Sequence, residues 1–190
     1  MVEKHRHFIL HKPWGYLSQF INNQTKRKKK LLGELYKFPK GTMAIGRLDY
    51  ASEGLLLLTT DGKISAEIRS NKVEKEYYVQ VDGIITQKAI FNLKNGVEIG
   101  FDGKKYTTKP GKASRINDPK FPLRSQKIRD DRHGPTSWIS MTITEGKFRQ
   151  VRKMTAAVGF PTLRLIRIRI GNILLDDLKV GSVKEMNNFN

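Results

Sequence analysis

A short polar segment, Gly46-Arg47-Leu48-Asp49, holds the two side chains whose types and spacing best suit chemistry. Hydrophobic stretches flank the segment and predict two strands that would fix a turn between them. Gly46 and Gly54 bound this turn and would let the backbone approach a ligand closely. A carboxylate held in this way is a candidate nucleophile or general base. An arginine and an aspartate in a turn also commonly form a surface ion pair, so the residues alone leave both interpretations open.

Tyr77 and Arg152 are further candidates for a reactive site. Tyr77 lies in the alternating stretch KEYYVQVDG, where it shares one strand face with Val79 and Val81. It is either a core aromatic with its hydroxyl at the edge or a platform on which a base stacks. Arg152 lies in the helical pattern of residues 151–158, on its basic side. It either belongs to a reactive site or is only a surface charge of a basic helix.

The composition excludes several kinds of site. The chain has no cysteine, which removes disulfides, thiolate metal sites and cysteine nucleophiles. His5, His7 and His11 are close in sequence, but no carboxylate or thiolate cluster accompanies them, so we expect no metal. No glycine-rich nucleotide-binding motif predicts a cofactor, and no Gly-x-Ser-x-Gly elbow predicts a nucleophilic serine. No stretch approaches the ~20 apolar residues of a membrane span, so we expect a cytoplasmic protein that does not bind membranes.

The charge balance favours a polyanionic partner. Lys and Arg total 36 against 18 for Asp and Glu, which gives a formal net charge of +18 in 190 residues. Nucleic acid neutralises such a surplus far better than a small metabolite does. Lys26–Lys30 are consecutive cations that would repel one another in a packed element. We expect them in a surface loop that either contacts phosphate or only aids solubility.

The strands and helices that would position these residues interleave without a regular repeat. Their order predicts an α+β fold, with a mixed, mainly antiparallel sheet in two lobes around a central catalytic cleft. We expect residues 1–190 to form a single catalytic domain. Strand patterns occupy residues 7–11, 43–45, 55–58, 75–82, 137–143 and 165–170, and helical patterns occupy residues 64–68, 86–95 and 151–158.

Local signals mark where some of these elements begin and end. Thr86 is expected to cap a helix that stops before Gly96, which supplies a left-handed conformation. Asp102-Gly103 predicts a hairpin turn. Arg115–Pro135 has no sustained period and is expected to be a long, mobile excursion. The alternation in residues 165–170 predicts a strand with one cationic face.

Four ordered motifs resemble those of a known family. GRLDYASEGLLLLTTDG resembles the signature of the pseudouridine synthases that modify ribosomal RNA. HKPWG resembles the family's Lys-Pro-x-Gly turn, KEYYVQVDG its Lys-x-Tyr strand, and EGKFRQVRKMTAAVG its Gln-Val-Arg helix. The match spans residues 8–171 and, with no accessory RNA-binding domain expected before HKPWG, is similar to the large-subunit branch. Residues 50–52 and Phe148 depart from the commoner residues but spare Asp49 and Arg152.

The resemblance implies that the protein isomerises a specific uridine of 23S ribosomal RNA to pseudouridine, without a cofactor. It implies that Asp49 is the catalytic carboxylate, which acts either by covalent attachment to the ribose or by helping to remove a ribose proton. It also implies that Tyr77 stacks on the uracil and that Arg152 keeps Asp49 ionised. Arg47 would point toward the displaced nucleotide or a phosphate.

A uridine inside folded RNA must be flipped out, and basic contacts to the RNA backbone offset that cost. The residues expected to contact RNA are Lys12, Arg47, Lys75, Arg149, Lys153 and Arg167, together with Lys26–Lys30, Arg169 and the Arg115–Pro135 loop. We expect a monomer that needs no protein partner. The alternative function is a non-catalytic RNA-binding or ribosome-assembly protein. Asp49 discriminates between the two, because an acid that faces phosphates would weaken a pure binder.

Overall fold

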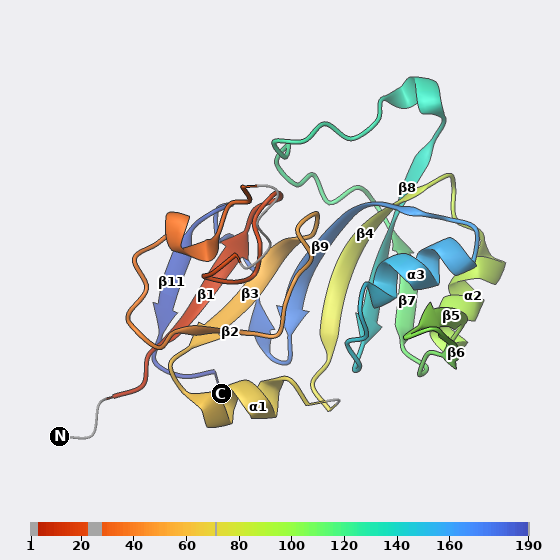
Figure 1. The fold of residues 1–190 in the computed structure, drawn as a ribbon. Coiled ribbons are helices and arrows are strands. Elements are labelled where there is room, and N and C mark those ends of the chain that lie inside the picture. The colour runs from red at the N-terminus through yellow and green to blue at the C-terminus, as the bar shows by residue number, and fades with distance from the viewer. Residues whose placement is uncertain (1–3, 23–27, 71, 190) are drawn as a thin grey trace. The chain divides into compact units, whose positions relative to one another are not determined.

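The computed structural model describes residues 4–22, 28–70 and 72–189 (Figure 1). The chain divides into two compact units. Unit 1 comprises Met1–Ser70, Arg124–Gln126 and Arg167–Asn190, and unit 2 comprises Asn71–Leu123 and Lys127–Ile166. The interpretation of residues 1–190 as a single catalytic domain stays a prediction. Within the described ranges, no helix is both long enough and apolar enough to cross a membrane.

Unit 1 is built on a sheet whose central strands are buried on both faces. Its strands are β1 (His7–Lys12), β2 (Met43–Ile45), β3 (Glu53–Thr59), the C-terminal part of β9 (Thr162–Ile170), β10 (Ile173–Leu174) and β11 (Val183–Met186). Hydrogen bonds give the order β11-β1-β3-β9, with β2 paired to β3 and β10 paired to β9. β1 runs antiparallel to both β3 and β11. Every residue of β1 and β3 is buried, which explains the continuous apolar run Leu55–Leu58.

One face of this sheet carries the hydrophobic core of unit 1. Alternate residues of a strand share a face, so Phe8 and Leu10 of β1 meet Leu56 and Leu58 of β3. Leu32, in the short 3-10 helix η1 (Leu32–Glu34), completes the cluster. Helix α1 (Gly62–Ile68) follows β3 and begins at Asp61, whose carboxylate accepts a hydrogen bond from the Lys63 amide at 2.8 Å.

Unit 2 is a second antiparallel arrangement with two helices. Its elements are β4 (Lys75–Asp82), α2 (Gln87–Asn95), β5 (Glu98–Phe101), β6 (Lys104–Thr107), β7 (Lys112–Ile116), η2 (Asp131–His133), β8 (Thr136–Ile143), α3 (Gln150–Ala157) and the N-terminal part of β9. The strand order is β9-β4-β8-β7, and β5 and β6 form a separate hairpin. β4 pairs with β8 over its whole length. Tyr77, Val79 and Val81 are buried on one face of β4, as the alternation predicted.

The predicted helix and turn signals in unit 2 are confirmed, with one correction. The Thr86 hydroxyl accepts a hydrogen bond from the Ala89 amide at 3.2 Å and caps α2. Gly96 ends the helix with φ +99 and ψ 144, which is not the predicted left-handed helical conformation. A Cβ at Gly96 would lie 2.2 Å from the Thr108 carbonyl oxygen, so the close approach of the backbone just after β6 requires glycine. The predicted turn at Asp102-Gly103 joins β5 to β6, with positive φ at both residues.

The predicted excursion Arg115–Pro135 is shorter than expected, because its first two residues complete β7. Phe121 anchors its first half: the ring packs against Tyr78 and Trp138, with ring centroids 6.2 Å and 6.4 Å apart. The Arg164 guanidinium lies 5.9 Å from the Phe121 ring. These contacts fasten the excursion at this point, and its mobility elsewhere stays a prediction.

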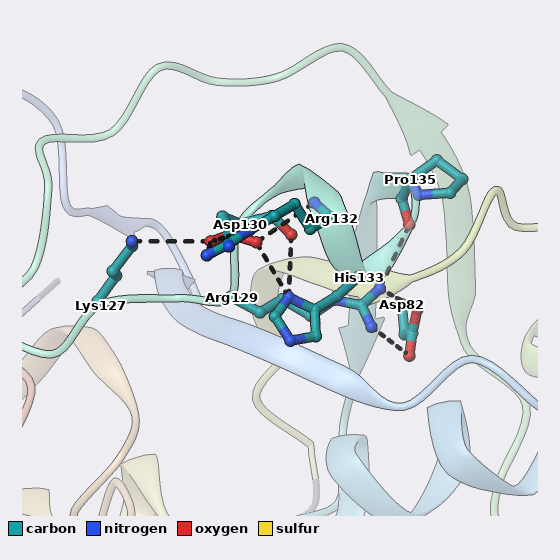
Figure 2. Close-up of polar contacts among 7 residues, drawn as sticks. All are labelled: Asp82, Lys127, Arg129, Asp130, Arg132, His133 and Pro135. Atoms are coloured by element: carbon teal, nitrogen blue, oxygen red, sulfur yellow. Dashed lines mark hydrogen bonds and ion pairs between the residues drawn. The ribbon is translucent and has the colours of Figure 1, made fainter.

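Figure 2 shows the second fastening of the same excursion. The Arg129 guanidinium forms an ion pair with the Asp82 carboxylate at the end of β4 and also reaches the Pro135 carbonyl, 3.5 Å away. Next to it, Asp130 accepts hydrogen bonds from Arg132 and His133 at 2.7 Å and 3.1 Å. The pKa of Asp130 is lowered, chiefly because Arg132 donates to its carboxylate. The expectation of a mobile excursion overlooked these side-chain anchors.

Candidate active site

Asp49 lies in unit 1, in the tight connection between β2 and β3, and is half-buried. Its neighbours on both sides are tied to the segment that follows β1. The Ser18 hydroxyl donates to the Leu48 carbonyl at 2.8 Å and accepts from the Leu48 amide at 3.0 Å. The Gly15 amide donates to the Tyr50 carbonyl at 2.9 Å. These bonds hold the backbone of Asp49 from either side, so its carboxylate is positioned by a fixed frame.

Lys12 is the third anchor of this turn. Its side chain is 0% exposed, and the ammonium group donates to the Ser52 carbonyl at 2.7 Å and to the Pro13 carbonyl at 2.9 Å. Burial lowers the pKa of Lys12 to about 7, because desolvation penalises the charged form more than the carboxylates of Glu53 and Asp49 favour it. An ammonium bound to two carbonyls supports the turn, and the expected contact of Lys12 with RNA stays a prediction.

Arg167 is also buried, and its expected contact with RNA stays a prediction as well. It is buried rather than exposed on a cationic face, and its Nε donates to the Leu55 carbonyl at 2.8 Å. The alternation failed here because β9 is covered on both faces, which the sequence period does not reveal. The Arg167 backbone also explains Gly54, which has φ +103 and whose Cβ would lie 2.3 Å from the Arg167 carbonyl oxygen. Glycine is therefore required at position 54 mainly because the Arg167 backbone packs against it, rather than to let the backbone approach a ligand.

Unit 1 therefore brings three of the expected site residues into electrostatic range of one another. Lys12 interacts with Asp49, which favours its charged form, and with Arg167, which opposes it. Arg47 lies two residues from Asp49 and is exposed, so its guanidinium is accessible to solvent. Lys29 adds a cation beside the turn, with its Nζ 5.5 Å from the centroid of the Tyr50 ring. Lys26 and Arg27, from the same cluster, lie outside the described residues.

Five of the other expected site residues lie in unit 2. Tyr77 is 9% exposed and stands opposite Met141 across the β4–β8 pairing. Lys75, at the start of β4, donates to the Thr144 carbonyl at 3.0 Å. On α3, Arg152 and Lys153 are half-buried, and Arg149 is exposed immediately before the helix.

A buried carboxylate that sequence reasoning missed organises the start of α3. Glu145 accepts hydrogen bonds from the Tyr106 hydroxyl, the Lys109 amide and the Gln150 side-chain amide, at 2.5 Å, 2.8 Å and 2.6 Å. The pKa of Tyr106 is raised, chiefly because its hydroxyl donates to Glu145. Glu145 thus fixes where the helix that carries Arg152 begins. Glu145 lies two residues after the predicted strand 137–143, and nothing in that position predicted its role.

Within the described residues, no three histidine, aspartate or glutamate side chains gather in a way that would hold a metal ion. The histidines near the N-terminus bond to the protein instead. His7 Nδ1 hydrogen bonds with the Thr59 hydroxyl at 2.9 Å, and His11 Nδ1 with the Leu178 carbonyl at 2.7 Å. Burial lowers the pKa of His7, because desolvation disfavours the charged imidazole.

Residues 6–157 match the RNA pseudouridylate synthase family, and the chain belongs to that family. Ribosomal large subunit pseudouridine synthase E of Vibrio parahaemolyticus is 40% identical over 187 residues, 97% of this chain and 75% of the relative. The protein of the same name from Xanthomonas axonopodis pv. citri is 42% identical over 90% of this chain and 88% of its own length. A solved structure titled as a pseudouridylate synthase matches with a TM-score of 0.77 and 28% identity, covering 97% of this chain and 71% of that one. The α+β fold and the resemblance to the large-subunit branch are thereby confirmed.

Proposed function

We propose that this protein isomerises a specific uridine of 23S ribosomal RNA to pseudouridine, with Asp49 as the catalytic carboxylate. The supporting observation is the position of Asp49, a half-buried carboxylate on a turn held by Ser18, Gly15 and Lys12. A side chain placed this firmly meets the reacting atoms with little loss of freedom, which is how positioning lowers a barrier. The names of the relatives support large-subunit RNA as the substrate.

The reaction breaks the N1–C1′ bond of the uridine, turns the uracil, and joins C5 to C1′. The proton on C5 is then removed, and N1 gains a proton. No atom is gained or lost and no redox change occurs, so the chemistry requires no cofactor. Asp49 assists departure of the base, either by bonding to the ribose or by helping to remove a ribose proton. Tyr77 and Arg152 belong to the same proposed catalytic set, as the family motifs imply, and Tyr77 stacks on the uracil.

Cations supply the binding energy for the RNA. Arg47, Lys75, Arg149 and Lys153 remain proposed RNA contacts, and Lys28–Lys30 join them. Lys29 lies over the ring of Tyr50, next in sequence to Asp49, so a phosphate bound there would lie near the catalytic turn. We also propose that the protein works in the cytoplasm as a monomer, without a protein partner.

The test is single-turnover conversion of 23S ribosomal RNA by the purified protein and by Asp49→Asn. The amide keeps the size of the carboxylate and its turn, so the thermal melt and RNA affinity are expected to match the wild type. Turnover is expected to fall by several orders of magnitude, because each ~1.36 kcal/mol added to the barrier costs tenfold in rate. Pseudouridine mapping in cells with and without the gene identifies the uridine. Near-normal conversion by Asp49→Asn would reject the assignment, and no lost pseudouridine in the cells would favour a non-catalytic RNA-binding protein.

A further inference from the structure

Phe148 stands out on the surface of unit 2. It lies between Lys147 and Arg149, immediately before α3, and 66% of its side chain is exposed to solvent. The Lys153 ammonium lies 5.6 Å from the centroid of its ring. A single exposed ring is ordinary on a protein surface, but Phe148 shares the Lys153 cation with a second ring, Phe101, and such a cluster invites a functional explanation.

The β5–β6 hairpin continues this surface with two more rings. The centroids of Phe101 and Tyr106 are 6.1 Å apart. The Lys147 ammonium lies 4.8 Å from the Phe101 centroid and 5.0 Å from that of Tyr106. Lys153 donates to the Gly100 carbonyl at 2.6 Å and lies 5.9 Å from the Phe101 ring. Both lysines are thus held in place by the hairpin, with their charges beside aromatic rings.

The half-buried rings have a structural explanation that Phe148 lacks. Phe101 and Tyr106 lie beneath the two lysines, and the Tyr106 hydroxyl reaches the buried Glu145, so together they dock the hairpin against the start of α3. Phe148 adds little to this docking, because most of its ring faces water. Its ring is the part of the cluster that remains available to a ligand.

The charges around Phe148 select the kind of ligand. The exposed or half-buried cations of the hairpin and the start of α3 are Lys104, Lys105, Lys147, Arg149, Arg152 and Lys153. The acids on the same elements are Glu98, Asp102 and Glu145. Glu98 pairs with Lys105 at 2.9 Å, and Glu145 is buried. The surface is therefore positive, and an aromatic ring among fixed cations is the combination that binds a nucleobase and its phosphate.

We propose that Phe148, with Lys147 and Lys153, forms a stacking subsite for an unpaired nucleotide of the RNA. The base lies on the Phe148 ring and its phosphate is neutralised by the lysines. Tyr77 is buried in the face of β4 whereas Phe148 stands in solvent, so the two rings serve different nucleotides. The subsite rests on the proposed function in that RNA is the ligand. It adds affinity for RNA without touching the reacting uridine.

The test compares three variants of the full chain: Phe148→Ala, Phe148→Tyr and Phe91→Ala. Phe91 is a matched control, because it lies on α2 of the same unit and is 65% exposed. The probe is a fluorescent oligouridylate of about 12 nucleotides, within the range of site sizes for single-stranded RNA. An abasic ribose–phosphate strand of equal length measures the contribution of phosphate contacts alone.

Phe148→Ala is expected to bind oligouridylate about tenfold more weakly, equivalent to ~1.4 kcal/mol. Phe148→Tyr and Phe91→Ala are expected to bind like the wild type, and Phe148→Ala is expected to leave the affinity for the abasic strand unchanged. The subsite is refuted if Phe148→Ala binds oligouridylate normally or weakens both strands equally. Conversion of ribosomal RNA, measured separately, keeps the two proposals distinct. An inactive wild-type protein that still shows the oligouridylate effect would reject the reaction and retain the subsite.

Discussion

Burial of Lys12 makes a measurable prediction about how stability depends on pH. The folded protein holds this lysine with a pKa of about 7, whereas the unfolded chain restores the ordinary value of 10.5. Between these two values the unfolded state binds a proton that the folded state has released. The free energy of unfolding therefore rises with pH. The stabilisation gained when the folded state releases the Lys12 proton is complete above pH 10.5 and is lost as the pH falls through about 7.

The change that isolates this effect is Lys12→Met, which keeps an unbranched side chain and removes the titrating group. From about pH 7 to about pH 9, the free energy of unfolding of the wild type should rise relative to the variant by about 2 kcal/mol. A constant offset accompanies this rise, because methionine leaves the Ser52 and Pro13 carbonyls without their donor, at ~1–3 kcal/mol for each carbonyl.

The measurement is urea unfolding followed by tryptophan fluorescence. The protein has two tryptophans, Trp14 in unit 1 and Trp138 in unit 2, so a Trp138→Phe background reports on unit 1 alone. Lys40→Met is the matched control, because Lys40 is an exposed lysine of the same unit. If the difference in the free energy of unfolding between wild type and Lys12→Met stays constant with pH, the lowered pKa of Lys12 is refuted.

Three further substitutions test the site. Gly54→Ala should destabilise unit 1 by several kcal/mol in thermal melts, because the new Cβ would lie 2.3 Å from the Arg167 carbonyl oxygen. The control is Gly46→Ala, whose Cβ would meet no atom within 4 Å. Both glycines have positive φ, +103 at Gly54 and +70 at Gly46, so the control measures the cost of backbone strain without a clash. Equal melting temperatures for the two variants would contradict this reading. Tyr77→Phe should retain RNA affinity, because stacking survives, while single-turnover conversion falls about 10²-fold if the hydroxyl transfers a proton. Unchanged conversion would leave Tyr77 a stacking role alone.

The sequence predicted the strands and helices well where one periodicity dominates. The alternation around Tyr77 and the helical spacing of Val151, Met154 and Thr155 both correspond to buried faces in the structure. The Asp102-Gly103 turn was also predictable, because few residues adopt positive φ in a two-residue hairpin.

Prediction failed where a charged side chain turns inward. Nothing in the sequence distinguishes Lys12 or Arg167 from surface cations, because their burial depends on carbonyls supplied by β3 and the turn before it. Ser18 was equally invisible, since a serine in a loop has no pattern that points to Leu48, 30 residues away. Asp49 itself was identified by resemblance to a family, and spacing alone had left it as one interpretation of two.

The pairing of β1 with β11 has a consequence for the order in which the protein forms during synthesis. Strand β1 begins at His7, yet its neighbour β11 begins only at Val183, and Arg6 bonds to Glu185 at 2.7 Å. Unit 1 therefore cannot complete its sheet until the last strand has left the ribosome. Unit 2 ends at Ile166, so its strands and helices are available earlier. The half of the protein that carries Asp49 is thus begun first and finished last, and a chain that stalls after Ile166 would hold all of unit 2 but lack β11 of the unit 1 sheet.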